Sequence, residues 1–571
     1  MTKLYIFGKL LIEIVGDKMK KLKLKYKDRY IENIECETPL YEIAKELKED
    51  YKYPIVGASL DGYLVDLNAK VTENESIEFY DTSSVIGNRI YARSLEFLVT
   101  VASKKVLGNS CDILINYSLE NGIYIEIIGK KINSISIKKI EEEMQKMVEE
   151  KQPLTQVIVD RLDAIKYFKK NGQIDKVNSL KYMTNKTITL YSLNDVYDYF
   201  YWPLVYNTKL LKKFEIINLK ENRFVLLYPT TTNPNKVKEY INHELTSKTY
   251  EDFQNWGRLI NITTASDLNR QCTMGKDIEI VKLFETHYED QLSSIAEEIA
   301  KQKDKIKVIL LAGPSSSGKT TTAKKLALYL RVKGLQTKKI SLDDYFVDRI
   351  YAPTDEDGNL DYSDIKSLDV NLFQKQLSRM LKGNKVLMPT YDFVTGKKIY
   401  KDNYIKLEEN DIIIVEGIHT LNEKLTSIVP RENKYKIFIS PLVSLKLDNH
   451  NRIHSTDVRK IRRIVRDSLF RGTSAEETLA MWPNVDKEAI KNIYPYQDDA
   501  DAMLNSSLGY ELNVLRIYAE PLLYGIESTS KEYIEAVRLI NLLHNFLTIT
   551  SEVVPKDSIL REFIGGSSFK D

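Results

Sequence analysis

The sequence predicts a multidomain protein, with an α/β domain at the C-terminus and α+β domains at the N-terminus. The 571 residues are enough for roughly three or four domains. From residue 306 onward, short apolar runs alternate with helical patterns, which is the rhythm of a parallel sheet with helices on both faces. Nearer the N-terminus, apolar and charged residues alternate in short runs, as is typical of half-buried strands.

The composition excludes several classes of protein. The 83 Lys and Arg residues nearly balance the 81 Asp and Glu residues, so the net charge of +2 gives no support to binding nucleic acid or membranes by bulk charge. No run approaches the ~18 apolar residues of a membrane span. Cys36, Cys111 and Cys272 lie far apart and form no disulfide framework, which fits a reducing compartment. We expect a soluble, cytoplasmic protein.

Residues 1–19 read as an N-terminal extension and residues 20–85 as a small α+β domain. The segment KLKLKYK predicts a half-buried strand, and Thr38 is positioned to cap a helix that follows it. An Asp-Gly pair at residues 61–62 lies between two strand-like runs and predicts a hairpin.

Residues 90–270 read as a second α+β unit, and residues 274–305 as one long connecting helix. The helix is predicted from apolar residues that recur at spacings of three and four: Ile280, Phe284, Tyr288, Leu292, Ile295 and Ile299.

The segment GPSSSGKT, from Gly313 to Thr320, carries the most specific motif of the chain. It fits G-x-x-x-x-G-K-[ST] and lies between a predicted strand and a predicted helix, which is the context that a phosphate-binding loop requires. The loop amides and the positive end of the helix bind phosphate oxygens. Lys319 is expected to reach the β- and γ-phosphates, and Thr320 to bind Mg²⁺. Motor proteins, GTPases and small-molecule kinases all use such a loop.

Three acidic residues at the ends of two predicted strands narrow the choice among these classes of protein. Asp343 and Asp344 follow one predicted strand and Glu416 ends another, so all three lie at the sheet edge where ligands bind. A carboxylate such as Asp343 can orient an acceptor hydroxyl and accept its proton. Glu416 is a candidate for holding Mg²⁺.

A basic run, DVRKIRRIVRDSLFRG, is the third feature of this domain. It contains Arg459, Lys460, Arg462, Arg463, Arg466 and Arg471. We interpret it as a lid whose guanidinium groups close over the transferred phosphoryl group and stabilise its charge. Nucleic-acid binding is the alternative, but the run lacks interleaved aromatic residues.

Residues 306–525 resemble the uridine kinase and phosphoribulokinase-like branch of P-loop kinases. The matching segments, in family order, are GPSSSGKTT, SLDDYF, GNLDYSDIKSLDV, PTYDFVTGKK, IIIVEGIH and RRIVRDSLFRG. The resemblance implies a P-loop kinase that uses ATP and Mg²⁺. It also implies the following roles: catalysis by Asp343, Lys319, Arg466 and Arg471; substrate binding by Asp361, Tyr391 and Arg463; metal binding by Thr320 and Glu416; and ATP binding by Gly313, Pro314, Ser315, Ser316, Ser317, Gly318, Lys319, Thr320 and Thr321.

The sequence departs from this family where the base would be read. Uridine kinases commonly carry a His in the YDF segment, and here Gly396 occupies that place. Leu360 stands where the family has an aromatic residue before the ribose-binding acid. The resemblance therefore implies the phosphoryl-transfer chemistry more strongly than it implies uridine as the acceptor.

The N-terminal half resembles two parts of threonyl-tRNA synthetase. Residues 20–85 are similar to a TGS domain, and residues 90–270 to the synthetase's second additional domain. At the His and Cys positions of that editing site, this chain has Arg93, Phe97, Phe200 and Leu204. None of these four can replace a His or Cys ligand, so the resemblance implies the fold without editing or metal binding.

Together these features predict ATP-dependent phosphorylation of the primary hydroxyl of a nucleoside, as in uridine kinases. Two alternatives remain open at this point. The acceptor is another small alcohol, such as a sugar phosphate or a pantothenate-like compound. Otherwise the protein is an RNA- or ribosome-associated regulator that uses the phosphate loop as a switch. RNA binding by the N-terminal half and oligomer formation also remain open, and no membrane partner is expected.

Overall fold

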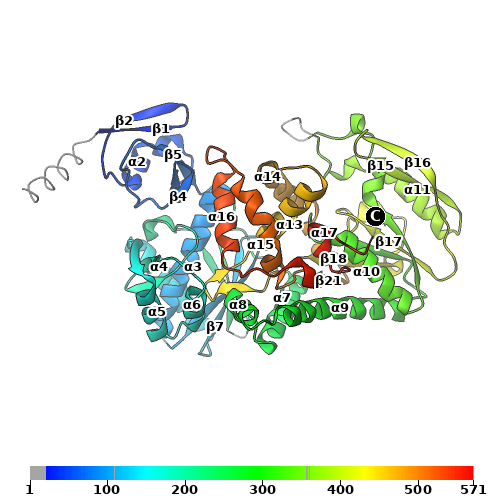
Figure 1. The fold of residues 1–571 in the computed structure, drawn as a ribbon, viewed down its shortest axis with the longest axis horizontal. Coiled ribbons are helices and arrows are strands. Elements are labelled where there is room, and N and C mark those ends of the chain that lie inside the picture. The colour runs from blue at the N-terminus through cyan, green and yellow to red at the C-terminus, as the bar shows by residue number, and fades with distance from the viewer. Residues whose placement is uncertain (1–20, 109, 221, 355–357, 359, 570–571) are drawn as a thin grey trace, which may run out of the picture.

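The computed structural model describes residues 21–108, 110–220, 222–354, 358 and 360–569, so the expected extension at residues 1–19 lies outside the described part. Three modules follow one another along the chain (Figure 1). They are the N-terminal module (residues 21–84), the central module (residues 85–240) and the C-terminal module (residues 306–569). Among the described residues, no helix is long and apolar enough to cross a membrane.

The N-terminal module is a five-stranded sheet with one short helix, α2 (Leu40–Glu46). The strand order is β2-β1-β5-β3-β4, with bounds β1 Lys21–Tyr26, β2 Arg29–Glu35, β3 Ile55–Leu60, β4 Tyr63–Val65 and β5 Ser76–Asp81. Strand β1 alternates as expected, because its lysines are exposed while Leu22, Leu24 and Tyr26 are buried.

Two local predictions in this module have different outcomes. The Asp61-Gly62 pair does form the β3–β4 turn, with φ values of 46° and 81°. The prediction that Thr38 caps the helix is wrong. Pro39 occupies the cap position, and the Thr38 hydroxyl instead donates to the carbonyl of Glu35 at the end of β2.

The central module packs two antiparallel sheets around a long buried helix, α3 (Val85–Leu107). One sheet has the order β11-β12-β7-β6 and the other β10-β9-β8. The bounds are β6 Asp112–Leu119, β7 Gly122–Ile128, β8 Thr155–Asp160, β9 Thr187–Leu193, β10 Val196–Asp198, β11 Glu215–Asn218 and β12 Arg223–Leu227. The outer helices are α4 Ser134–Glu149, α5 Arg161–Lys170 and α6 Ile174–Leu180.

Three helices connect the central and C-terminal modules: α7 (Glu244–Leu259), α8 (Ala265–Thr273) and α9 (Asp277–Lys301). The long α9 runs along one edge of the molecule in Figure 1. Its predicted apolar stripe is buried in the main core, so α9 packs as part of the C-terminal module and is more than a linker.

The C-terminal module is built on a parallel sheet of order β14-β17-β13-β18-β21. The bounds are β13 Val308–Ala312, β14 Gln336–Ser341, β17 Asp411–Glu416, β18 Lys434–Ser440 and β21 Ala502–Asn505. Alternate residues of β13 enter two different cores, with Ile309 and Leu311 on one face and Val308 and Leu310 on the other. The predicted parallel sheet covered on both faces is therefore present.

Helices and hairpins complete this module around the sheet. The helices are α10 Lys319–Val332, α11 Val370–Leu381, α12 Glu423–Thr426, α13 Ser455–Phe470, α14 Ala475–Asn492, α15 Glu511–Tyr524, α16 Tyr533–Leu543 and α17 Arg561–Ile564. The hairpins are β15 Val386–Asp392 with β16 Lys397–Ile405, and β19 Lys446–Asp448 with β20 Asn451–Arg452.

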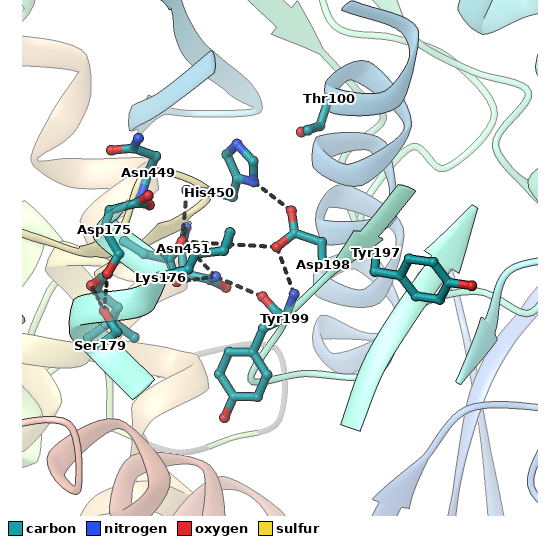
Figure 2. A network of polar contacts seen from close by, with 12 residues as sticks. Thr100, Asp175, Lys176, Ser179, Tyr197, Asp198, Tyr199, Asn449, His450 and Asn451 are labelled. Atoms are coloured by element: carbon teal, nitrogen blue, oxygen red, sulfur yellow. Dashed lines mark hydrogen bonds and ion pairs between the residues drawn. The ribbon is translucent and has the colours of Figure 1, made fainter. Parts of the chain in front are cut away.

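The β19–β20 hairpin is embedded in the central module. Its turn residue His450 is fully buried and bonds Asp198 through Nδ1 at 2.5 Å and Asp112 through Nε2 at 3.0 Å. Lys176 joins the same network, with Nζ 2.6 Å from Asp198 and 3.0 Å from Asp448 (Figure 2). The hairpin leads directly into α13, so these contacts fix the N-terminal end of the arginine-rich helix to the central module.

Candidate active site

The loop between β13 and α10 has the backbone that phosphate binding requires. A Cβ added at Gly313 would lie 2.1 Å from the carbonyl oxygen of Ile439, so no side chain fits there. Gly318 has φ +89° and Ser316 has φ 61°, both in the left-handed region. These two turns wrap the loop over the N-terminus of α10, where amide groups and the helix dipole favour an anion.

Side chains of the loop have unused hydrogen-bonding capacity. The hydroxyl groups of Ser316 and Ser317 are buried and have no hydrogen-bond partner among the described residues. Buried hydroxyls without partners are costly, and phosphate oxygens would satisfy them. The Nζ atom of Lys319 bends back to the carbonyl of Pro314 at 3.1 Å, which keeps its charge above the loop. The site therefore fits the phosphates of ATP.

Glu416 lies beside this loop at the end of β17. Its Oε1 accepts hydrogen bonds from the hydroxyls of Thr320, at 3.4 Å, and Ser341, at 3.2 Å, and lies 3.6 Å from Nζ of Lys339. Burial raises the pKa of Glu416, and the nearby Lys339 opposes that shift. A hydroxyl and a carboxylate held together beside a phosphate loop are oxygen ligands of the kind that Mg²⁺ prefers.

Asp343 and Asp344 begin the turn that follows β14, at the same edge of the sheet. Asp343 is exposed, whereas Asp344 is half-buried and accepts a hydrogen bond from the amide of Tyr391 at 3.3 Å. Surrounding protein raises the pKa of Asp343, and the positive charge of Lys319 lowers it. Of these two carboxylates, that of Asp343 is exposed, makes no hydrogen bond with the described residues and is influenced by the charge of Lys319, so it is open to an acceptor.

Arginines of α13 line the opposite side of the loop. Arg459 donates from Nε to the carbonyl of Ser315 at 2.9 Å, and Arg463 donates to the hydroxyl of the same serine at 3.1 Å. Arg462 is fully buried and bridges the loop to Glu511, 2.6 Å from its Nε. Arg459 and Arg463 therefore hold the loop at Ser315, and Arg462 holds it at the carbonyl of Ser316.

One carboxylate collects the remaining arginines. Asp467, which is 2% exposed, lies 3.1 Å from Arg463, 2.7 Å from Arg466 and 3.6 Å from Arg471. Bonds from a single acid hold three guanidinium groups close to one another, at the end of α13 nearest Asp343 and Lys319. Arg471 has the most exposed side chain of the three, 58%.

The interpretation of this segment as a lid is wrong for α13. Val458, Ile461, Ile464 and Val465 are buried in the main core of the module. Since a helix packed on this scale does not swing open, α13 forms a fixed wall of the site. Residues 471–474, which join α13 to α14, are more exposed, and Ala475 enters the same core again.

A cluster of aromatic rings lies beside Asp344, which accepts a hydrogen bond from the amide of Tyr391. Tyr391 is 4% exposed, with its ring 5.5 Å from that of Phe346 and 5.0 Å from that of Phe393. Asp361 precedes Tyr362, whose ring is 5.5 Å from that of Phe346, and Oδ1 of Asp361 accepts from the hydroxyl and amide of Ser363 and from the amide of Asp364. Partial burial would raise the pKa of Asp361, but these hydrogen bonds lower it, so the group is a carboxylate with Oδ2 still available.

The space above Gly396 is filled by Arg349. A Cβ at Gly396 would come within 2.7 Å of both Cβ and Nε of Arg349. The guanidinium donates to the hydroxyl of Tyr362 at 3.3 Å and to the carbonyl of Phe393. A cationic donor therefore stands where the sequence shows only a glycine. Lys398, which follows Gly396 by two residues, does not supply this donor, because its side chain is paired with Asp369.

Sequence reasoning missed three residues of this site: Asp467, Arg349 and Glu562. Glu562 in α17 accepts hydrogen bonds from the hydroxyl of Thr321, at 2.7 Å, and from its amide, at 3.2 Å. The sequence spacing could have indicated Asp467, because it is four residues from both Arg463 and Arg471 and so shares a helical face with them. Glu562 had none, since 241 residues separate it from the loop.

The four positions that correspond to an editing site all lie in the central module. Phe97 and Phe200 are in edge-on ring contact at 5.2 Å, and Leu204 is fully buried. Arg93 donates to the side chain of Asn451 in the β20 strand at 3.0 Å. No group of three or more metal-ligating side chains occurs within the described residues.

Comparison with known proteins gives two different sets of relatives. The model of the phosphoribulokinase / uridine kinase family matches residues 308–509. A uridine kinase from Borrelia duttonii is 31% identical over 202 residues, which are 35% of this chain and 86% of that kinase. A threonine–tRNA ligase from Carboxydothermus hydrogenoformans is 26% identical over 200 residues, 35% of this chain. The chain spans about a third of that ligase's length, 31%.

A kinase is also among the solved structures that match part of this chain. The D-glycerate 3-kinase from Cryptococcus neoformans has 14% sequence identity over 37% of this chain and 89% of that chain, with a TM-score of 0.28.

Proposed function

The chain belongs to the phosphoribulokinase / uridine kinase family, and from this premise we propose that it transfers the γ-phosphoryl group of ATP to the primary hydroxyl of a nucleoside. The observation that carries the proposal is the grouping of Lys319, Asp343 and Glu416 around a phosphate loop with unsatisfied serine hydroxyls. Phosphoryl transfer depends mainly on positioning and on electrostatic stabilisation, and these residues supply both.

Each residue has a distinct part in this proposal. ATP binds along Gly313–Thr321, and Thr320 with Glu416 holds Mg²⁺, which neutralises charge on the β- and γ-phosphates. Asp343 accepts the proton of the acceptor hydroxyl, helped by the pKa shift that its surroundings cause. Lys319, Arg466 and Arg471 stabilise the negative charge of the transition state.

A nucleoside is favoured as acceptor by the aromatic cluster beside Asp344. Phe393, which is 57% exposed, offers apolar surface to a base, with Tyr391 and Phe346 buried behind it, and Asp361 offers a carboxylate oxygen to ribose hydroxyls. Arg349 supplies a donor beside this cluster. Uridine is the acceptor named for the relative from Borrelia duttonii. We also propose that the protein works in the cytoplasm.

The likeness of the N-terminal half to threonine–tRNA ligases supports a second candidate, binding of RNA by the N-terminal and central modules. Such binding would weaken steeply as salt concentration rises, because phosphate contacts release counterions. RNA binding that is lost at 200 mM salt, together with no acceptor-dependent turnover, would favour this candidate over the kinase.

The test of the proposed function is a panel of acceptors. ADP release is measured with each ribonucleoside, with a sugar phosphate and with a pantothenate-like alcohol, all at saturating ATP and Mg²⁺. We expect release to depend on a nucleoside. Turnover with only the non-nucleoside alcohols would reject the nucleoside and keep the kinase, and release that no acceptor changes would reject both.

A further inference from the structure

A cavity of about 80 Å³ lies between α3 of the central module and the start of α13. Both modules contribute to its wall, which includes Arg89, Arg93, Glu96, Trp202, Arg452 and Asp457. One water needs roughly 10–15 Å³ of such space, so the cavity has room for several waters or for one ion of the size of phosphate.

The ion-pair network around this cavity contains more positive than negative groups. The cations are Arg89, Arg93, Arg452, Lys460 and Arg538, and the carboxylates are Glu96, Asp457 and Glu535. Arg538 is bidentate on Asp457, at 2.7 and 2.5 Å, and this leaves Asp457 little capacity for other cations. An excess of two buried positive charges is costly unless an anion offsets it.

The nearest carboxylates outside this network are shared with other cations, and of these carboxylates only Asp448 contributes to the pKa of Arg93. Asp448 and Asp198 are bound to Lys176, and Asp198 also binds His450. Burial lowers the pKa of Arg93, and the positive charges of Arg452 and Arg538 lower it further, while Glu96 and Asp448 only partly compensate. The arginines of the cavity therefore repel one another.

Two polar atoms of the cavity wall have no hydrogen-bond partner among the described residues, the donor Nε1 of Trp202 and the acceptor Oε2 of Glu96. Trp202 is 8% exposed. The cap residue of α13 is His454, whose side chain makes no capping hydrogen bond. Burial and the surrounding arginines lower the pKa of His454 well below its usual value, so this ring is neutral. The positive end of the 16-residue helix α13 thus faces a cavity with an unsatisfied donor.

We propose that this cavity binds a small tetrahedral oxyanion of the phosphate class, held by Arg89, Arg93 and Arg452, with Trp202 as a neutral donor. The site is separate from the phosphate loop. It joins the central module to α13, whose residues Arg459 and Arg463 contact that loop. The anion would therefore stabilise the arginine wall of the active site and link its position to the phosphate concentration.

Calorimetric titration of the full-length protein with inorganic phosphate tests the proposal. The Lys319→Ala variant is used as background, because it weakens phosphate binding at the loop. We expect this variant to bind phosphate still, and Lys319→Ala/Arg93→Gln to bind it at least about tenfold more weakly, as loss of a hydrogen bond to a charged group predicts. Arg258→Gln, which removes a half-exposed ion pair with Glu126 outside the cavity, should change nothing on the same background.

Hydrogen exchange of the unmodified protein covers the case in which Arg93→Gln does not fold. Phosphate should slow exchange of the amides at residues 453–458, at the start of α13, and equal concentrations of acetate should not. Protection confined to residues 313–321 would overturn the proposal. So would equal phosphate affinity with and without Arg93.

Discussion

Lys319 places a compact positive charge, the ammonium group, at the phosphate loop. Its Nζ donates to the carbonyl of Pro314 at 3.1 Å, which holds the side chain over the loop. Lys319→Ala removes this charge without opening the core. We expect it to lower kcat at least about 100-fold, the loss typical of one electrostatic contact to a transition state, while the unfolding temperature stays close to the original. An unchanged kcat in a folded variant would reject the assignment of the loop.

Asp361 is expected to bind the sugar and not the base. Asp361→Ala should therefore reduce kcat/KM for every accepted ribonucleoside about equally, by the ~1.5–3 kcal/mol of a hydrogen bond to a charged group. Ser363→Ala is the matched control, because it breaks one bond of the same turn but keeps the carboxylate. Equal losses in the two variants would mean that Asp361 only supports the turn.

Base selectivity depends on Arg349, the donor above Gly396. Two of its five N–H groups already bond Tyr362 and Phe393, which fixes the guanidinium on these partners and not on a base edge. We expect a preference for uridine below about 10⁴-fold over other ribonucleosides, the discrimination of a dedicated hydrogen-bonding site. Arg349→Ala should reduce whatever preference exists. Competition assays with paired nucleosides measure both, and a larger preference that survives Arg349→Ala would show that another residue reads the base.

At the scale of the element, α13 acts as a rigid carrier of charge. Arg466 and Arg471 lie at its C-terminal end, and charge in the transition state develops only during transfer. Arg466→Ala and Arg471→Ala should each lower kcat more than they raise the acceptor KM. Steady-state kinetics with varied acceptor separates the two effects. A change in acceptor KM alone would assign these arginines to binding.

Asp467 gives a second test of the same element. Asp467→Asn keeps the shape of the side chain but removes the charge that gathers Arg463, Arg466 and Arg471. Because these three like charges then repel one another, we expect kcat to fall, with ATP KM affected less. Asp486→Asn is the control. Asp486 lies in α14 and pairs at 3.7 Å with Arg459, another arginine of α13. Equal effects would show a general loss of helix packing.

The sequence predicted elements well where one short pattern decides them. The loop after β13 and the Asp61-Gly62 turn depend on backbone conformations that few residues adopt, and both were predicted correctly. The cap of α2 was not, because the helix begins one residue later than expected, with Pro39 at the cap position. Interpreting α13 as a lid failed because its apolar residues pack into a core formed partly by α15 and α16, which local periodicity does not reveal.

For the whole molecule, the main surprise is the contact between the central module and the base of α13. His450 enters the central module because the β19–β20 hairpin projects from the sheet. No short sequence motif predicts this contact between the modules. The partners Asp112 and Asp198 are separated from it by 338 and 252 residues. Arg93 and Glu562 were likewise beyond sequence reasoning as partners of the C-terminal module and of the loop.

This contact predicts a pH dependence of stability. Burial lowers the pKa of His450, but Asp198 and Asp112 raise it to about 9, above the usual 6.5. A group whose pKa is raised on folding stabilises the folded state fully at any pH below its pKa in the unfolded chain. For His450 this stabilisation is therefore present below pH 6.5 and is lost as the pH rises through about 9. It amounts to roughly 3 kcal/mol. Asp112, whose pKa is lowered to about 2, acts oppositely, and its contribution is lost only as the pH falls through about 2.

Urea unfolding at pH 6.5 and pH 9.5 measures this dependence. The unmodified protein should be less stable at pH 9.5, and His450→Asn should remove most of the difference. His544→Asn, at an exposed histidine paired with Glu520, is the control and should leave it. If His450→Asn keeps the full pH difference, the buried network does not hold a charged histidine.

Transfer of radiolabelled phosphate from [γ-³²P]ATP to uridine, followed by chromatography of the product, tests the central claim most directly. The account predicts labelled nucleoside monophosphate with the unmodified protein, and a loss of at least about 100-fold with Asp343→Asn, which keeps the side-chain shape but cannot accept the proton. Labelled product at equal rates from both proteins would contradict Asp343 as the base. No labelled product from uridine or any other ribonucleoside would contradict the proposed nucleoside kinase.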